Sequence, residues 1–167
     1  FMGDMTLRRS FELSRNVATI RLINERVGMK HVASVAKRFN VDPNLPLHLA
    51  GILGATETTV LKMAAAYGMI ANGGKLIIPT FFDHVQDRRG KKVLVNKGSA
   101  LVETSSLDDL NLMPTLQDNR PAVTDPVVAY QTTTLLTGVV QRGTGKLLQK
   151  LDHPIAVKSG TTNDFKD

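Results

Sequence analysis

Apolar residues recur every three or four positions through the first part of the chain, and this spacing predicts helices. We expect the first helix over residues 4–13, with Asp4 as its N-cap. Ser14-Arg15-Asn16 interrupts it, and a second helix follows that ends at Gly28. The apolar face of this second helix consists of Val17, Ile20, Ile23 and Val27.

Two further helices are expected before the middle of the chain. The first covers residues 29–39 and stops at the two prolines within 42–46. The second covers residues 58–71 and is apolar on every side, with Lys62 as its only charge. A helix of that kind is typical of a buried position, so we predict that residues 58–71 lie in the core.

The second half of the chain mixes strands and helices. Two strands are expected, 76–85 and 92–95, around the turn 87–90. Residues 96–120 are polar and lack periodicity, which indicates a loop or an insertion. Pro126 opens a helix to about Gln141, and Gly143-Thr144-Gly145 ends it. The residues of this helix expected to point inward are Val128, Leu135 and Val139.

The last segment, residues 155–162, is rich in small and β-branched residues and predicts a strand. Helices first, then strands, then a helix and a final strand indicate a mixed α/β (α+β) fold.

Composition narrows the class of protein. The 167 residues, 42% hydrophobic, suit one globular domain, and both ends fall within predicted structure, so we expect a longer parent protein. The net charge of +6 is spread along the chain, and without Trp no stacking platform for single-stranded nucleic acid is present. The absence of cysteine excludes disulfides and thiolate chemistry. No window is long and apolar enough for a membrane span.

One short motif on the final strand carries candidate chemistry. In Lys158-Ser159-Gly160-Thr161-Thr162, alternation puts the Ser159 and Thr161 hydroxyls on one face and Lys158 on the other. Gly160 leaves room for a ligand against the backbone. The pattern suits recognition of a peptide carboxylate, although by itself it also fits an ordinary strand with a solvated lysine. Ser14-Arg15-Asn16 likewise fits a simple N-cap when taken alone.

Two other patterns do not hold. Gly143-Thr144-Gly145-Lys146 resembles a phosphate-binding loop, but Val140 and Leu147 occupy positions where that motif needs Gly and Ser or Thr. The histidines lack the paired spacing of a metal-binding helix, so we expect no metal. The four histidines are His31, His48, His84 and His153.

Taken together, the motifs resemble the transpeptidase domain of penicillin-binding proteins, whose pattern is Ser-x-x-Lys, Ser-x-Asn, then Lys-[Ser/Thr]-Gly. Ser14-Arg15-Asn16 matches the second element, and Lys158-Ser159-Gly160 matches the third. The stretches 53–75 and 139–145 are also similar, and 158–167 is similar to the bifunctional class A members in particular. The resemblance covers residues 1–167 as part of one such domain, except about 96–120.

The sequence departs from the family at its first motif. Residues 1–13 contain no Ser-x-x-Lys, so the chain lacks the stretch that would hold the nucleophile. Ser34-Val35-Ala36-Lys37 matches the pattern but follows Ser14, on a helix expected to be peripheral. We therefore interpret it as a chance match and expect residues 1–167 alone to be inactive.

The resemblance implies a β-lactamase/DD-transpeptidase-like fold, with a helical subdomain and an antiparallel sheet. It implies a peptidoglycan DD-transpeptidase that cross-links stem peptides ending in D-Ala-D-Ala through a serine acyl-enzyme and binds β-lactams. Ser14, Asn16 and Lys158 would be catalytic, and Ser159, Gly160, Thr161 and Thr162 would bind substrate. No cofactor and no nucleic acid are implied.

Several alternatives stay open from the sequence. The parent could be a DD-carboxypeptidase or a β-lactamase-type hydrolase, or the chain could be a non-catalytic binding module. By resemblance, the parent is membrane-anchored on the extracytoplasmic (periplasmic) face, with a glycosyltransferase domain upstream.

Overall fold

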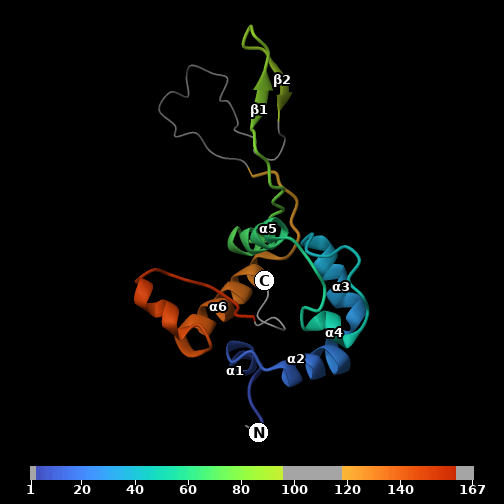
Figure 1. Ribbon diagram of the computed structural model, residues 1–167, viewed down its shortest axis with the longest axis vertical. Coiled ribbons are helices and arrows are strands. Elements are labelled where there is room, and N and C mark those ends of the chain that lie inside the picture. The colour runs from blue at the N-terminus through green and yellow to red at the C-terminus, as the bar shows by residue number, and fades with distance from the viewer. Residues whose placement is uncertain (1–2, 96–117, 161–167) are drawn as a thin grey trace.

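The computed structural model describes residues 3–95 and 118–160. In it a helical body carries a two-stranded hairpin that projects away from the helices (Figure 1). The helices of the body are α1 (Leu7–Glu12), α2 (Asn16–Leu22), η1 (Ile23–Val27), α3 (Met29–Arg38), α4 (Leu49–Ile52), α5 (Val60–Ala71), α6 (Pro126–Arg142) and η3 (Lys146–Leu151).

The N-terminal helices follow the predicted order, with one correction. Thr6, not Asp4, caps α1, because its hydroxyl accepts the Arg9 N–H at 3.2 Å. The second predicted helix is α2 continued by a π-helical turn, η1, and it ends at Gly28 as predicted. Gly28 has a φ of 81°, which favours glycine at this helix end.

The core lies mainly between α5 and α6, which pack against each other. Its buried apolar residues are Ala66, Met69, Val123, Ala129, Leu136, Val139 and Val140. The predicted burial of residues 58–71 is wrong at the start of α5, where Val60 is 88% exposed. A helix that is apolar on every side can be buried, but the elements that pack against it determine which of its turns are buried.

Helix α6 begins at Pro126 and ends before Gly143 as predicted, and Asp125 caps it by accepting the Val127 N–H at 2.7 Å. Its inward face is only partly as predicted. Val139 is fully buried, Leu135 is half-buried, and Val128 is exposed. The buried stripe is rotated toward Ala129 and Leu136, because it faces both α1 and α5.

The hairpin pairs β1 (His84–Gln86) with β2 (Lys92–Val95) in antiparallel register, Val85 opposite Leu94. The second strand is as predicted, whereas the first is shorter than the predicted 76–85, because Pro79 cannot donate a ladder hydrogen bond. Residues 96–117, most of the predicted loop, lie outside the described residues.

The predicted final strand does not form over the described residues 155–160. A strand needs another strand beside it, but the Val157 N–H donates to the Leu136 carbonyl of α6 at 3.3 Å. The segment is therefore held by a helix and stays irregular.

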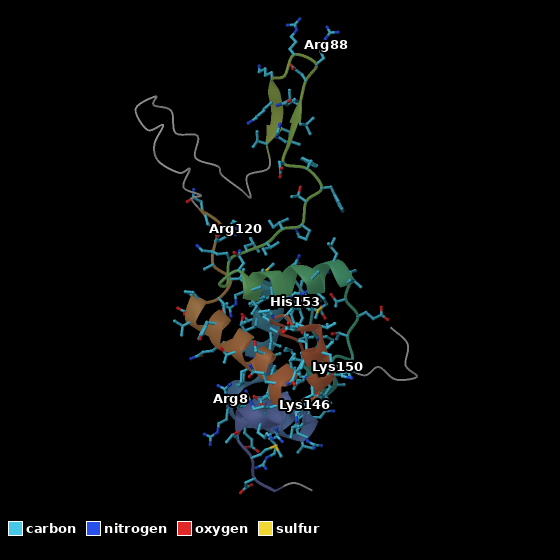
Figure 2. The ribbon with its side chains drawn as sticks, turned by 90° about the vertical axis from the view of Figure 1, so that its left-hand side faces the viewer. Arg8, Arg88, Arg120, Lys146, Lys150 and His153 are labelled. Carbon is cyan, nitrogen blue, oxygen red and sulfur yellow. The ribbon has the colours of Figure 1, made fainter. Side chains whose placement is uncertain are left out.

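Figure 2 shows basic side chains along the length of the molecule, with Arg88 at the hairpin tip and Arg8 and Lys146 at the helical end. This agrees with the scattered charge of the sequence. Across the two described stretches, no helix is long and apolar enough to cross a membrane.

Candidate active site

Ser14 lies in the turn between α1 and α2, and the backbone there is unusual. Its φ is 53°, in the left-handed region that non-glycine residues adopt at a cost on the order of 1–3 kcal/mol. The turn is held to α1 by two hydrogen bonds: the Ser14 N–H donates to the Phe11 carbonyl at 3.0 Å, and the Arg15 N–H donates to the Ser10 carbonyl at 2.9 Å. The Ser14 side chain is half-buried, and its hydroxyl contacts a group from a distant part of the sequence.

Lys158 is that group. Its Nζ donates to Ser14 Oγ at 2.6 Å, across 144 positions of sequence. Nζ also donates to the Ser159 carbonyl at 2.9 Å and lies 5.9 Å from the centroid of the Phe11 ring. The two sequence motifs, Ser-x-Asn and Lys-Ser-Gly, therefore meet at their first residues.

The surroundings of Lys158 are apolar. It lines a cavity of about 660 Å³ together with side chains of α3, α5 and α6, such as Val35, Tyr67 and Leu136. Burial disfavours the charged form of an amine, and it lowers the pKa of Lys158 from its ordinary value. An ammonium here is a stronger proton donor than one on the surface.

Ser159 faces a residue that sequence reasoning did not assign to the site. Its Oγ lies 2.6 Å from the Oγ1 of Thr144, in the Gly143-Thr144-Gly145 turn after α6. Thr144 appeared in the sequence only as part of a helix-breaking turn and a rejected phosphate-loop pattern. A hydroxyl between two glycines was the available signal, since such a turn exposes its central side chain.

The remaining predicted site residues are Asn16, Gly160, Thr161 and Thr162. Asn16 is the first residue of α2 and is exposed. A Cβ built on Gly160 would meet no atom of the described residues within 4 Å, so the space there is open. Thr161 and Thr162 lie outside the described residues.

The rejected patterns have ordinary structural roles. Ser34 and Lys37 lie on α3, and both are exposed. Gly143 follows the end of α6 rather than a strand, which a phosphate loop would require. His48 caps α4, where its Nδ1 accepts the Gly51 N–H at 3.2 Å. Among residues 3–95 and 118–160, no group of three potential ligands could hold a metal ion.

In this helical body a Ser-x-Asn turn meets a Lys-Ser-Gly segment, and these are two of the three motifs of penicillin-binding transpeptidase domains. Residues 2–167 match the model of the penicillin binding protein transpeptidase domain, and the chain belongs to this family. It is 39% identical, over its whole length, to penicillin-binding protein 1A of Rickettsia bellii, and it spans 21% of that protein.

Solved structures agree on the fold. The chain is similar to penicillin-binding protein 1A from Haemophilus influenzae, with a TM-score of 0.72 and 24% identity over 95% of this chain and 27% of that one. It is also similar to the D,D-transpeptidase domain of a peptidoglycan glycosyltransferase from Eggerthella lenta, with a TM-score of 0.64 and 22% identity over 96% of this chain and 42% of that one. The predicted fold class is confirmed.

Proposed function

We propose that the protein containing this chain is a peptidoglycan D,D-transpeptidase that cross-links stem peptides through a serine acyl-enzyme and is acylated by penicillin. The observation that carries this proposal is the hydrogen bond of 2.6 Å between Lys158 Nζ and Ser14 Oγ. Membership of the transpeptidase family supports it.

The hydrogen bond supports a role for Ser14 in proton transfer. As an ammonium, Lys158 can only donate, so Ser14 Oγ accepts from it. The Ser14 hydroxyl proton is then left to donate to another acceptor. When the scissile C–N bond breaks, the leaving nitrogen needs a proton, and Ser14 supplies it as the lowered pKa of Lys158 favours passing a replacement proton to Ser14.

The same cation sets the electrostatics for substrate binding. A stem peptide ends in a carboxylate, and a partly buried ammonium attracts it more strongly than a solvated one. We assign the Ser159 hydroxyl, together with Thr161, to that carboxylate, and Asn16 to the peptide backbone. Gly160 and Thr162 would line the same binding segment. We expect no metal or organic cofactor in this reaction.

The nucleophile and the acylation base are expected from a Ser-x-x-Lys segment outside residues 1–167, because none precedes Ser14 in this chain. We further propose that the full-length protein carries a glycosyltransferase domain and is anchored at the extracytoplasmic face of the membrane. Its partners would then be D-Ala-D-Ala stem peptides and β-lactams.

Labelling with a fluorescent penicillin tests the proposal. The full-length protein should form a covalent adduct that survives denaturation, whereas the 167-residue chain should form none. An unlabelled full-length protein would contradict the proposed acyl-enzyme. Labelling of the 167-residue chain would show that the nucleophile lies within it.

A second assay separates transfer from hydrolysis. A transpeptidase passes the acyl group to an amine of a second stem peptide, whereas a carboxypeptidase or a β-lactamase passes it to water. We expect cross-linked product from the full-length protein and two stem peptides. Hydrolysed product alone would replace the transpeptidase by one of those hydrolases.

A further inference from the structure

The last residue of α1 carries a buried charge that the proposed mechanism does not use. Glu12 is only 2% exposed. Its carboxylate accepts hydrogen bonds from Arg142, the last residue of α6: Nη2 lies 2.6 Å from Oε1, and Nε lies 3.2 and 3.3 Å from the two oxygens. These bonds lower the pKa of Glu12, so the carboxylate is ionised at neutral pH.

The backbone around this ion pair is adapted to it. A methyl group on Gly138 would collide with the Glu12 carboxylate, and one on Gly143 would collide with the Glu12 carbonyl oxygen. That carbonyl accepts the Thr144 N–H at 3.2 Å, and Arg9 Nη1 donates to the Arg142 carbonyl at 3.0 Å. The ends of α1 and α6 are therefore joined by side chains and by backbone, in a space that only glycines leave open.

Both ends lead directly into the site. Glu12 precedes Ser14 by two residues, and Arg142 precedes Thr144 by two residues. Thr144 contacts the Ser159 hydroxyl, and Lys158 Nζ bonds both the Ser159 carbonyl and Ser14 Oγ. The contacts form a closed ring. On one side of the ring the Glu12–Arg142 ion pair joins the ends of α1 and α6, and on the other side Lys158 joins Ser14 to Ser159.

We propose that Glu12 and Arg142 are positioning residues that set the distance between Ser14 and Lys158. This inference rests on the proposed function. A shift of Glu12 would move Ser14, because the left-handed turn at Ser14 is hydrogen-bonded to the Phe11 and Ser10 carbonyls of α1. A shift of Arg142 would move Thr144 and, through it, Ser159.

A double-mutant cycle on the full-length protein tests the inference. Glu12→Ala should lower the rate constant of penicillin acylation about 100-fold, the effect of misplacing a catalytic group by roughly an ångström. If Glu12 acts through Ser14, the same substitution made in a Ser14→Ala protein should cost no more than about twofold, because the group that it positions is already absent.

A purely structural role predicts a different result. Glu12→Ala would then cost the same factor in the presence and in the absence of Ser14, and this additive outcome would overturn the inference. The rate constant is measured on the folded fraction, which thermal unfolding defines for each variant. Where Glu12→Ala does not fold, Arg142→Lys, which keeps a cation opposite Glu12, takes its place in the same cycle.

The chain offers a matched control. Glu25 pairs with Arg21 at 3.3 Å, one turn apart and largely exposed, so Glu25→Ala also removes a glutamate–arginine pair near the site's helices. It should change acylation by less than about twofold. Arg142→Lys should resemble Glu12→Ala, because a lysine cannot reproduce the two-pronged contact of the guanidinium.

The outcome of this cycle is distinct from the outcome for the proposed function. A Ser14→Ala protein acylated at the wild-type rate would contradict the proposed role of Ser14 itself. A slow Ser14→Ala protein together with an additive effect of Glu12→Ala would leave that role intact and contradict only the positioning role.

Discussion

Two serine–lysine pairs among the described residues show the difference between a match in sequence and a contact in space. Ser34 and Lys37 are three residues apart on α3, match a family pattern in spelling, and are both exposed. Ser14 and Lys158 are 144 positions apart and are joined by a hydrogen bond of 2.6 Å beside an apolar cavity. Reactivity in a serine enzyme depends on a desolvated donor and a fixed contact, which only the second pair has.

Removal of the Lys158 cation should have the largest effect on penicillin acylation. Lys158→Met keeps much of the side chain's length but removes the donor to Ser14 and to the Ser159 carbonyl. We expect penicillin acylation of the full-length protein to fall on the order of 1,000-fold, since both charge and hydrogen bonds are lost at a partly buried site. Stopped-flow or gel-based acylation kinetics measure it, and a loss below tenfold would contradict the assigned role.

Ser14→Ala should have the next largest effect, about 100-fold, which is typical of removing a proton-transfer group. The loss should appear in the rate constant rather than in the concentration of penicillin at half-saturation. The reason is that Ser14 is proposed to act on the leaving group and not on the bound carboxylate. A change confined to half-saturation would assign Ser14 to binding instead.

Thr144→Val should have a smaller effect, because it removes only the hydroxyl partner of Ser159. We expect about a fivefold increase in the concentration at half-saturation, equivalent to one neutral hydrogen bond. Thr134→Val is the matched control, because its hydroxyl donates to the Tyr130 carbonyl within α6 and Thr134 does not line the cavity beside Lys158. If the two variants bind penicillin equally well, Thr144 is not part of the binding site.

The ion pair between Glu12 and Arg142 should make the stability of the 167-residue chain depend on pH. Hydrogen bonds from Arg142 lower the pKa of Glu12 in the folded state, so its ionised form stabilises the fold above the ordinary glutamate pKa of 4.5. This contribution is lost as the pH falls through the lowered folded-state pKa. In denaturant titrations the free energy of unfolding should therefore decrease less toward acid pH for Glu12→Gln than for the wild type. Parallel curves would contradict this.

The smallest effect is expected at the other serine–lysine pair. Ser34→Ala and Lys37→Met, singly or together, should leave acylation within about twofold of the wild type, as is usual for exposed side chains. These variants are also the matched controls for Ser14→Ala and Lys158→Met. A large loss of labelling from Ser34→Ala would show that the exposed pair is the reactive one.

The extent of successful prediction differs between parts of the fold. Helix order, the end at Gly28 and the start of α6 at Pro126 were predictable, because caps and prolines act within a few residues. The first strand and the final strand were not, because strands depend on partners distant in sequence. The predicted burial of Val60 was wrong for the same reason: a buried surface is formed by two elements in contact, and the sequence of one does not identify the other.

The residues of the candidate site also differ in whether the sequence identified them. Ser14, Lys158 and Ser159 were singled out by motif, and the structure brings them within hydrogen-bond distance of one another, while their roles stay predictions. Thr144, Glu12 and Arg142 were not recognised, since a threonine in a turn and a glutamate or arginine at a helix end are common on any surface.

The sequence by itself determined the family, the order of the helices and the residue types that the chemistry needs, because these follow from local spacing and from side-chain identity. Only the tertiary structure decided which hydroxyl meets which amine, and that a glutamate is buried against an arginine behind them. The physical reason is that hydrogen bonds and desolvation act over a few ångströms of space, and distance along the chain does not report that separation.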